Sequence, residues 1–104
     1  MEKALIIGRD INYVWALRKL LEKYKIELEH TFTISEARVR IDNFRYKFII
    51  LDNLKDFELD MFIKINPKNI PIIGVDIEYP RFLTIQKDIS CPFMLSYLKE
   101  NFGF

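Results

Sequence analysis

Three short and nearly uninterrupted apolar runs constrain the fold of this chain more than any other feature. They span residues 4–7, 48–51 and 70–75. This pattern is typical of parallel strands that helices cover on both faces, because neither face of such a strand meets water. A fourth segment, residues 26–32, alternates apolar and polar side chains, which predicts a strand nearer to the sheet edge.

Segments with a helical period separate these runs. Residues 13–24 place six apolar side chains on one stripe, and either Asp10 or Asn12 can cap the N-terminus of that helix. Thr33 and Glu36 have the spacing of a capping box, which predicts the start of a second helix.

Two further helices are predicted in the second half of the chain. One spans residues 56–65, and the last contains Pro92 in its first turn. Strands and helices therefore alternate along residues 1–104. This order predicts a single α/β domain with an open, parallel, five-stranded sheet, right-handed crossovers and helices on both faces.

The composition excludes several classes of chemistry. Three glycines cannot supply a phosphate-binding glycine loop, while one histidine, His30, and one cysteine, Cys91, cannot form a structural zinc site or an internal disulfide. A net charge of +1 does not favour a nucleic-acid partner, and no apolar run is long enough to span a membrane. We expect a cytoplasmic protein that has no cofactor and is not an enzyme.

The candidate site is the edge of the sheet where the strands end. In open α/β sheets the functional crevice lies beyond the carboxyl ends of the strands. The polar or exceptional residues that follow a strand or precede the last helix are Gly8, Arg9, Asp10, Asp52, Asp76 and Cys91.

In order and spacing, the chain resembles the bacterial response-regulator receiver domain over almost its whole length. Residues 48–52 resemble the strand that ends in the phosphoaccepting aspartate, which places Asp52 at the phosphoacceptor position. Residues 35–37 resemble the preceding helix, residues 71–76 resemble the strand that ends in a hydroxyl, and residues 90–93 resemble the lysine-proline-phenylalanine signature. The resemblance implies a flavodoxin-like fold and a role in two-component signalling.

The departures from the receiver pattern concern the residues that bind the phosphoryl group. Gly8 and Arg9 stand where two adjacent acids hold magnesium, Asp76 replaces the hydroxyl, and Cys91 replaces the lysine. Transfer of a phosphoryl group to a carboxylate needs a divalent cation to neutralise the phosphate oxygens. The departures therefore predict a degenerate receiver, or pseudo-receiver, that holds no metal.

Arg9 is the nearest replacement for the missing metal charge. Two carboxylates at neighbouring strand ends are costly to keep ionised unless a cation joins them. We predict that the Arg9 guanidinium bridges Asp52 and Asp76. The alternative is that Arg9 points into solvent from a loop.

The segment between Asp76 and Cys91 is shorter than the family pattern by about two helical turns. The fourth helix of the family must therefore be shortened or absent. Either residues 81–86 form a short helix before a late strand at 88–90, or residues 82–86 are the fifth strand themselves. We favour the short helix and the late strand.

Two aromatic residues fall outside the inward stripes of their helices. Trp15 lies nearly opposite the stripe of the first helix, near Arg18 and Glu22, and Tyr97 leaves the inward side of the last helix. A large aromatic side chain among charges is typical of a contact surface. The alternative for Trp15 is packing over its own helix or against the last one.

The preferred function is that of a regulatory module that binds another protein or a second copy of itself as a homodimer. The resemblance implies the N-terminal regulatory domain of a larger transcription activator, in which receivers commonly control dimerisation. The alternative is a working receiver phosphorylated on Asp52, with Asp10 as the acid and Lys87 as the cation. A minor alternative is thiol chemistry at Cys91, since Cys-Pro-Phe resembles part of a glutaredoxin-type site.

Overall fold

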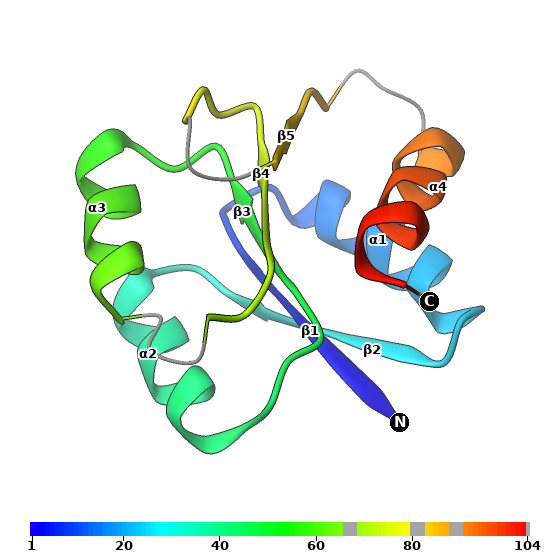
Figure 1. The fold of residues 1–104 in the computed structure, drawn as a ribbon, viewed down its shortest axis with the longest axis horizontal. Helices are drawn as coiled ribbons and strands as arrows, with labels where there is room; N and C mark the ends of the chain where they lie inside the picture. Colours follow the sequence, from blue (N-terminus) through cyan, green and yellow to red (C-terminus); the bar gives the residue numbers. More distant parts are fainter. Residues whose placement is uncertain (66–68, 80–82, 88–90, 104) are drawn as a thin grey trace.

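A computed structural model describes residues 1–65, 69–79, 83–87 and 91–103. In these residues, five parallel strands form one sheet in the order β2-β1-β3-β4-β5 (Figure 1). The strands are β1 (Glu2–Ile7), β2 (Ile26–Thr31), β3 (Ile49–Asp52), β4 (Ile72–Val75) and β5 (Leu83–Ile85). This arrangement confirms the predicted open parallel sheet, and it places the alternating strand β2 at an edge.

Within the described ranges, four helices cover the two faces of the sheet. They are α1 (Ile11–Glu22), α2 (Ile34–Asn43), α3 (Asp56–Ile65) and α4 (Cys91–Phe102). Figure 1 shows α1 and α4 together on one face and α2 and α3 together on the other. In the described part of the chain, no helix has the length and hydrophobicity needed to cross a membrane.

Side-chain caps start the first two helices where the sequence predicts them. The Asp10 carboxylate accepts a hydrogen bond of 3.2 Å from the Tyr13 backbone N–H. The Thr33 hydroxyl accepts one of the same length from the Glu36 backbone N–H. Each cap satisfies a backbone donor that the helix itself leaves without an acceptor.

The alternation of side chains along the strands builds one apolar core on each face. Phe48, with no exposed surface, belongs to the core under α1 and α4, and Phe62, equally buried, belongs to the core under α2 and α3. The ring of Phe102 stacks on that of Phe48, with centroids 5.1 Å apart. This contact docks the end of α4 on the sheet and so fixes the helix beside α1.

The fifth strand corrects the prediction of a short helix followed by a late strand. Residues 83–85 pair in parallel with residues 73–75 of β4, so the second of the two alternatives holds; residues 81–82 and 88–90 lie outside the described residues. The described residues between β4 and β5, 76–79, form no helix. Tyr79 packs there against the core and donates a 3.2 Å hydrogen bond to Asp60 of α3.

Candidate functional site: a carboxylate pocket closed by a lysine

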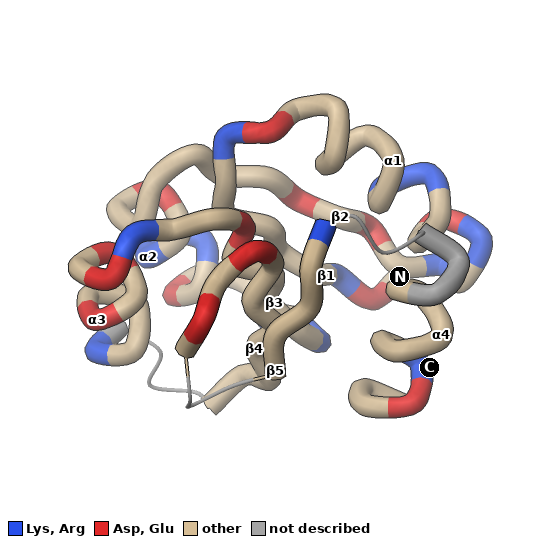
Figure 2. Tube along the Cα trace, turned by 90° about the horizontal axis from the view of Figure 1, so that it is seen from above, with Lys and Arg blue, Asp and Glu red and all other residues tan. Residues whose placement is uncertain are grey.

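Three aspartates and one lysine meet at the carboxyl edge of the sheet, and we call this group the carboxylate pocket. Asp52 is the last residue of β3, Asp10 caps α1, Asp76 follows β4, and Lys87 follows β5 by two residues. Figure 2 looks from above onto this edge, where basic and acidic residues are interspersed over the elements. The topology thus collects four charges from four different connections.

The Lys87 ammonium lies between two of the carboxylates. Its Nζ atom is 2.9 Å and 3.0 Å from the two oxygens of Asp52 and 3.1 Å from Asp10 Oδ2. The Asp52 side chain is only 1% exposed, whereas that of Lys87 is 26% exposed. A nearly buried carboxylate is therefore neutralised by a cation that still reaches water.

Burial and charge act against each other on these groups. Burial raises the pKa of the Asp52 carboxyl, and nearby Asp10 and Asp76 act in the same direction, although contact with Lys87 opposes them. Burial alone would lower the pKa of Lys87, but its hydrogen bonds and attraction to Asp52 and Asp10 leave that pKa raised. The Tyr13 backbone N–H and Lys87 hold the pKa of Asp10 below its ordinary value.

Asp76 contributes to the pocket through its hydrogen bonds to backbone groups of β5 and the turn that follows it. Its Oδ1 atom accepts a 2.8 Å hydrogen bond from the Lys87 backbone N–H, and its own N–H donates to the Ile85 carbonyl at 2.9 Å. Its φ of 55° is in the left-handed region, which aspartate tolerates better than most residues. Asp76 thus orients the turn that delivers the Lys87 side chain to Asp52.

Gly8 leaves the space that Asp52 occupies. A Cβ atom built on Gly8 would lie 2.8 Å from Asp52 Cβ and 3.3 Å from Asp52 Oδ2. Real Cβ atoms do not approach so closely, so an acid at this position does not fit beside Asp52 as it stands. The Gly8 carbonyl accepts a 2.7 Å hydrogen bond from His30 Nε2, a role that the sequence analysis did not assign to this histidine.

Arg9 corrects the predicted bridge between Asp52 and Asp76. Its guanidinium pairs instead with Glu58 of α3 at 3.2 Å, and its side chain is 58% exposed while that of Glu58 is 9% exposed. Successive residues at a strand end point to opposite sides, so Arg9 leaves the pocket because position 8 faces it. Glu58 also accepts a 3.2 Å hydrogen bond from the Lys55 backbone N–H at the start of α3.

The described residues do not fit the magnesium ion that the receiver resemblance implies. The side chain expected at position 8 has no room, position 9 carries a cation, and Lys87 Nζ lies between the two nearest carboxylates. Among the residues that the structure describes, no group of three or more His, Cys, Asp or Glu side chains could hold a metal ion. The cation beside Asp52 and Asp10 is instead the Lys87 ammonium.

Sequence reasoning assigned Lys87 to the pocket only in the alternative of a working receiver, as its cation. The signal that identifies it is local: Thr84 and Ile85 favour a strand, and a lysine two residues beyond that strand reaches the edge where Asp52 ends. The prediction that Cys91 replaces the pocket's lysine is therefore wrong, since Lys87 fills that role. The side chain of Cys91 lies outside the described residues.

The chain is similar to known proteins in its structure rather than in its sequence. No family model matches the chain, and no curated protein is similar to it in sequence. Solved structures match it over nearly its full length. A two-component response regulator from Clostridium difficile aligns with a TM-score of 0.77 and 17% identity, covering 96% of this chain and 94% of that one.

Two further structures show the same likeness. The beryllofluoride-activated NtrC4 receiver domain dimer gives a TM-score of 0.78 at 19% identity, covering 98% of this chain and 97% of that one. A CheY-like response regulator receiver domain from Methanospirillum hungatei gives 0.77 at 20% identity, covering 98% and 94%. The chain has a receiver-domain fold. In this receiver-like fold, Asp52 is the last residue of β3 and forms an ion pair with Lys87.

The two aromatic residues predicted on the surface differ in exposure. The Trp15 side chain is 54% exposed, and the Arg18 guanidinium carbon lies 5.7 Å from its ring centroid. Tyr97 is half-buried and packs against the core under α1 and α4, so the prediction that it leaves the inward side of its helix is wrong. Trp15 therefore remains the candidate contact residue.

Proposed function

We propose that this receiver-like domain is a regulatory module that binds another protein and does not use phosphorylation of Asp52. The observation that carries the proposal lies at the end of β1, where Gly8 has no room for an acidic side chain beside Asp52 and Arg9 pairs with Glu58 at 3.2 Å. A phosphoryl group added to Asp52 would therefore lack the pair of acids that holds a divalent cation against its oxygens. The pocket then acts as a fixed ionic link between the ends of β3 and β5 and the start of α1.

The proposal extends to the setting of the domain. Its receiver fold supports a place in two-component signalling, as the cytoplasmic regulatory part of a transcription activator. One structure of the same fold is a receiver-domain dimer, so the partner is either another protein or a second copy. Exposed Trp15 is the residue through which we expect such contact, because a large aromatic side chain gains most when a partner covers it.

Incubation with magnesium and acetyl phosphate, followed by mass spectrometry of the intact chain and its peptides, tests the proposal. We expect no phosphate on Asp52. Amide NMR with magnesium and beryllofluoride is the second readout, and we expect the amides of Asn53 and Lys87 to keep their shifts. Asp52→Asn is the matched control, since it removes the acceptor and keeps the size of the side chain.

A specific observation also favours the alternative function. Asp52, Asp10 and Lys87 do meet in one pocket, as a phosphorylatable receiver with Lys87 as its cation would require. In that case the mass increase would appear in the natural chain and disappear in Asp52→Asn. This outcome would replace the proposed function with phosphorylation of Asp52.

A further inference from the structure

The first half of α1 carries two large apolar side chains on its exposed side. Ile11 is 52% exposed and Trp15 is 54% exposed, and because they are four residues apart they lie on the same side of the helix. Arg18, three residues beyond Trp15, continues this stripe, and we call Ile11, Trp15 and Arg18 the α1 patch. Tryptophan and arginine are among the residue types that contribute most to the binding energy of protein interfaces, so the patch has the composition of an interface centre.

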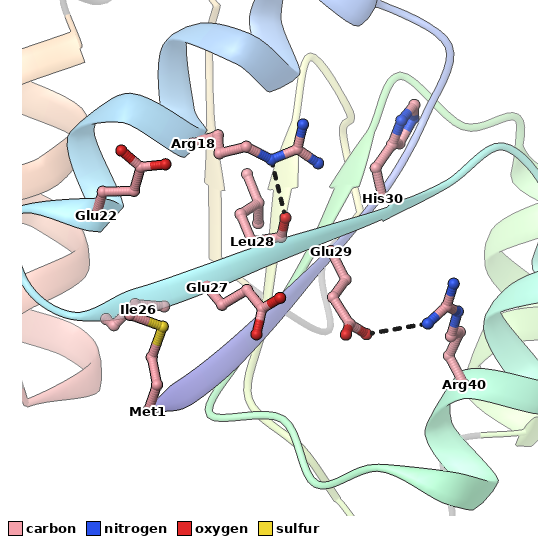
Figure 3. Close-up of a pocket in the computed structure, with 9 residues that line it drawn as sticks. All are labelled: Met1, Arg18, Glu22, Ile26, Glu27, Leu28, Glu29, His30 and Arg40. Carbon is pink, nitrogen blue, oxygen red and sulfur yellow. Dashed lines mark hydrogen bonds and ion pairs between the residues drawn. The ribbon is translucent and has the colours of Figure 1, made fainter.

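The Arg18 side chain is oriented before any partner binds. Its Nε atom donates a 3.1 Å hydrogen bond to the Leu28 carbonyl of β2 (Figure 3). Its guanidinium carbon lies 5.7 Å from the centroid of the Trp15 ring. Because Arg18 is half-buried and held by these two contacts, it has little conformational freedom to lose on binding.

The terminal nitrogens of the same guanidinium remain available. Within the described part of the chain, Arg18 forms no ion pair, and only its Nε atom forms a hydrogen bond. Glu22 follows Arg18 by one helical turn, but Figure 3 shows the guanidinium directed toward His30 and away from Glu22. The two Nη atoms therefore present a fork that matches the two oxygens of a carboxylate.

The charges around Trp15 favour an acidic occupant. Lys19, an exposed residue, follows Trp15 by one turn, and Asp10 at the start of the helix is paired with Lys87 in the carboxylate pocket. The acids Glu22 and Glu27 line a groove of about 740 Å³ beside β2 and lie toward the start of that strand (Figure 3). An occupant of the α1 patch thus meets two basic side chains first, and charge complementarity favours carboxylates on it.

A second copy of the chain supplies these carboxylates poorly. If two α1 helices pack antiparallel with Arg18 of each opposite Glu22 of the other, Trp15 falls opposite Lys25, beyond the end of α1. A register that brings the two Trp15 rings together instead places Arg18 opposite Asn12. Neither register covers Trp15 and pairs Arg18 with an acid at once, which favours a different chain as the occupant.

We propose that the α1 patch binds an acidic segment of a partner protein, in which a carboxylate meets the Arg18 guanidinium and a nearby apolar side chain covers Trp15 and Ile11. The inference rests on the proposed function, because it gives the chemistry of the partner expected at Trp15. Burial of the Trp15 ring supplies affinity, and the pairing with Arg18 supplies the preference for an acidic segment.

Trp15 is the only tryptophan of the chain, so its fluorescence reports on this surface. The probe is a short synthetic amphipathic peptide of leucine and glutamate, titrated into the ¹⁵N-labelled full chain. We expect the emission to move to shorter wavelength and the indole N–H signal of Trp15 to shift, because the peptide removes water from the ring. Peptides with glutamine or lysine in place of glutamate are the controls. Both should bind much more weakly, since the first offers Arg18 no charge and the second repels it.

The matched variants are Arg18→Gln and Arg38→Gln. Arg38 is an exposed residue of α2, on the other face of the sheet, so its replacement removes the same charge away from the patch. We expect Arg18→Gln to weaken binding of the glutamate peptide roughly tenfold and Arg38→Gln to change it much less. Arg18→Lys keeps the charge without the fork and should recover only part of the loss. Circular dichroism checks that each variant is folded.

Three results would overturn the proposal. They are an unchanged Trp15 emission and indole signal with the glutamate peptide, equally tight binding of either control peptide, and equal effects of Arg18→Gln and Arg38→Gln. A fourth concerns the occupant: if the Trp15 signals change with protein concentration in the absence of peptide, a second copy covers the patch and the proposed occupant is wrong.

The outcome for this inference is separable from that for the proposed function. If Asp52 is phosphorylated while the glutamate peptide still binds at Trp15, the proposed function fails and the assignment of the α1 patch stands. If Asp52 is not phosphorylated and the glutamate peptide does not bind, the assignment of the α1 patch alone is overturned.

Discussion

At the scale of single residues, Lys87 holds the charge balance of the carboxylate pocket. Replacement by methionine keeps most of the length of the side chain and removes its charge, which leaves Asp52 nearly buried without a cation. We expect Lys87→Met to lower the free energy of unfolding by ~3 kcal/mol, at the low end for a broken buried pair because the Lys87 side chain is 26% exposed. Urea denaturation at neutral pH measures the loss.

The double variant Lys87→Met with Asp52→Asn separates the ion pair from simple packing. Removal of both charges leaves no buried carboxylate to desolvate, so we expect it to restore most of the stability that Lys87→Met loses. If the losses of the two single variants simply add in the double variant, the two side chains are not coupled. That result would contradict the fixed ionic link that the proposed function assigns to the ends of β3 and β5.

Gly8 is the second residue whose replacement has a definite expected outcome. The Cβ atom of an alanine there would lie 2.8 Å from Asp52 Cβ, and that atom is too near the backbone to move freely. We expect Gly8→Ala to cost about 1–3 kcal/mol through this overpacking, and Gly8→Asp to cost more because it adds another carboxylate directly beside Asp52. Unchanged thermal midpoints for both variants would show that β1 and β3 can separate at this point.

At the scale of elements, Asp10 links the start of α1 to the pocket, and two substitutions separate its roles. Asp10→Asn keeps the cap on Tyr13 N–H and loses the attraction to Lys87, which should cost less than about 1 kcal/mol because the Asp10 side chain is 42% exposed. Asp10→Ala loses the cap as well and should cost about 1 kcal/mol more.

Thr33 provides the comparison for Asp10, because it caps α2 without an ion pair to the pocket. Thr33→Ala should therefore cost about as much as the difference between Asp10→Ala and Asp10→Asn, ~1 kcal/mol. Circular dichroism during urea titration measures all three variants. An Asp10→Asn loss as large as that of Asp10→Ala would mean that charge, rather than capping, starts α1.

The elements that sequence predicts well are those whose signal is local. The apolar runs, the alternation in β2 and the caps Asp10 and Thr33 each follow from residues a few positions apart. The predicted position of the fifth strand was wrong because that position depends on pairing with β4. A strand of three residues is too short to indicate this pairing in its own sequence. The likeness of residues 90–93 to the lysine-proline-phenylalanine signature put Cys91 at the lysine position, and the register to Cys91 then placed β5 too late and left Lys87 outside the pocket.

Arg9 shows a different limit of sequence reasoning. The need for a cation near Asp52 was predicted correctly, but which of two cations supplies it depends on the side to which each backbone position points. Gly8 faces Asp52, so Arg9 faces away and meets Glu58. Such alternation at a strand end becomes clear only when the register of β1 and β3 is fixed.

At the scale of the whole molecule, the sheet separates two ionic centres. The carboxylate pocket lies at the carboxyl ends of β3 and β5, whereas Glu29 of β2 gathers Lys3, Arg40 and the Tyr46 hydroxyl near the opposite ends of the strands. Burial raises the pKa of Tyr46, and its hydrogen bond to Glu29 acts in the same direction. Each centre therefore contains a basic or phenolic group, Lys87 or Tyr46, whose protonated form the folded state favours at alkaline pH.

This arrangement predicts how stability changes at alkaline pH. The folded chain keeps protons on Tyr46 and Lys87 where the unfolded chain begins to lose them, near their ordinary pKa values of 10.0 and 10.5. Their contribution is complete below those values and is lost as pH rises toward the raised values of the folded state. We expect the urea midpoint to fall above about pH 10, and Tyr46→Phe, less stable at neutral pH, to fall less steeply. If the urea midpoints of the natural chain and Tyr46→Phe fall with pH in parallel, the hydrogen bond to Glu29 does not keep the Tyr46 hydroxyl protonated. A flatter curve for Tyr46→Phe would show that deprotonation of Tyr46 contributes to unfolding at alkaline pH.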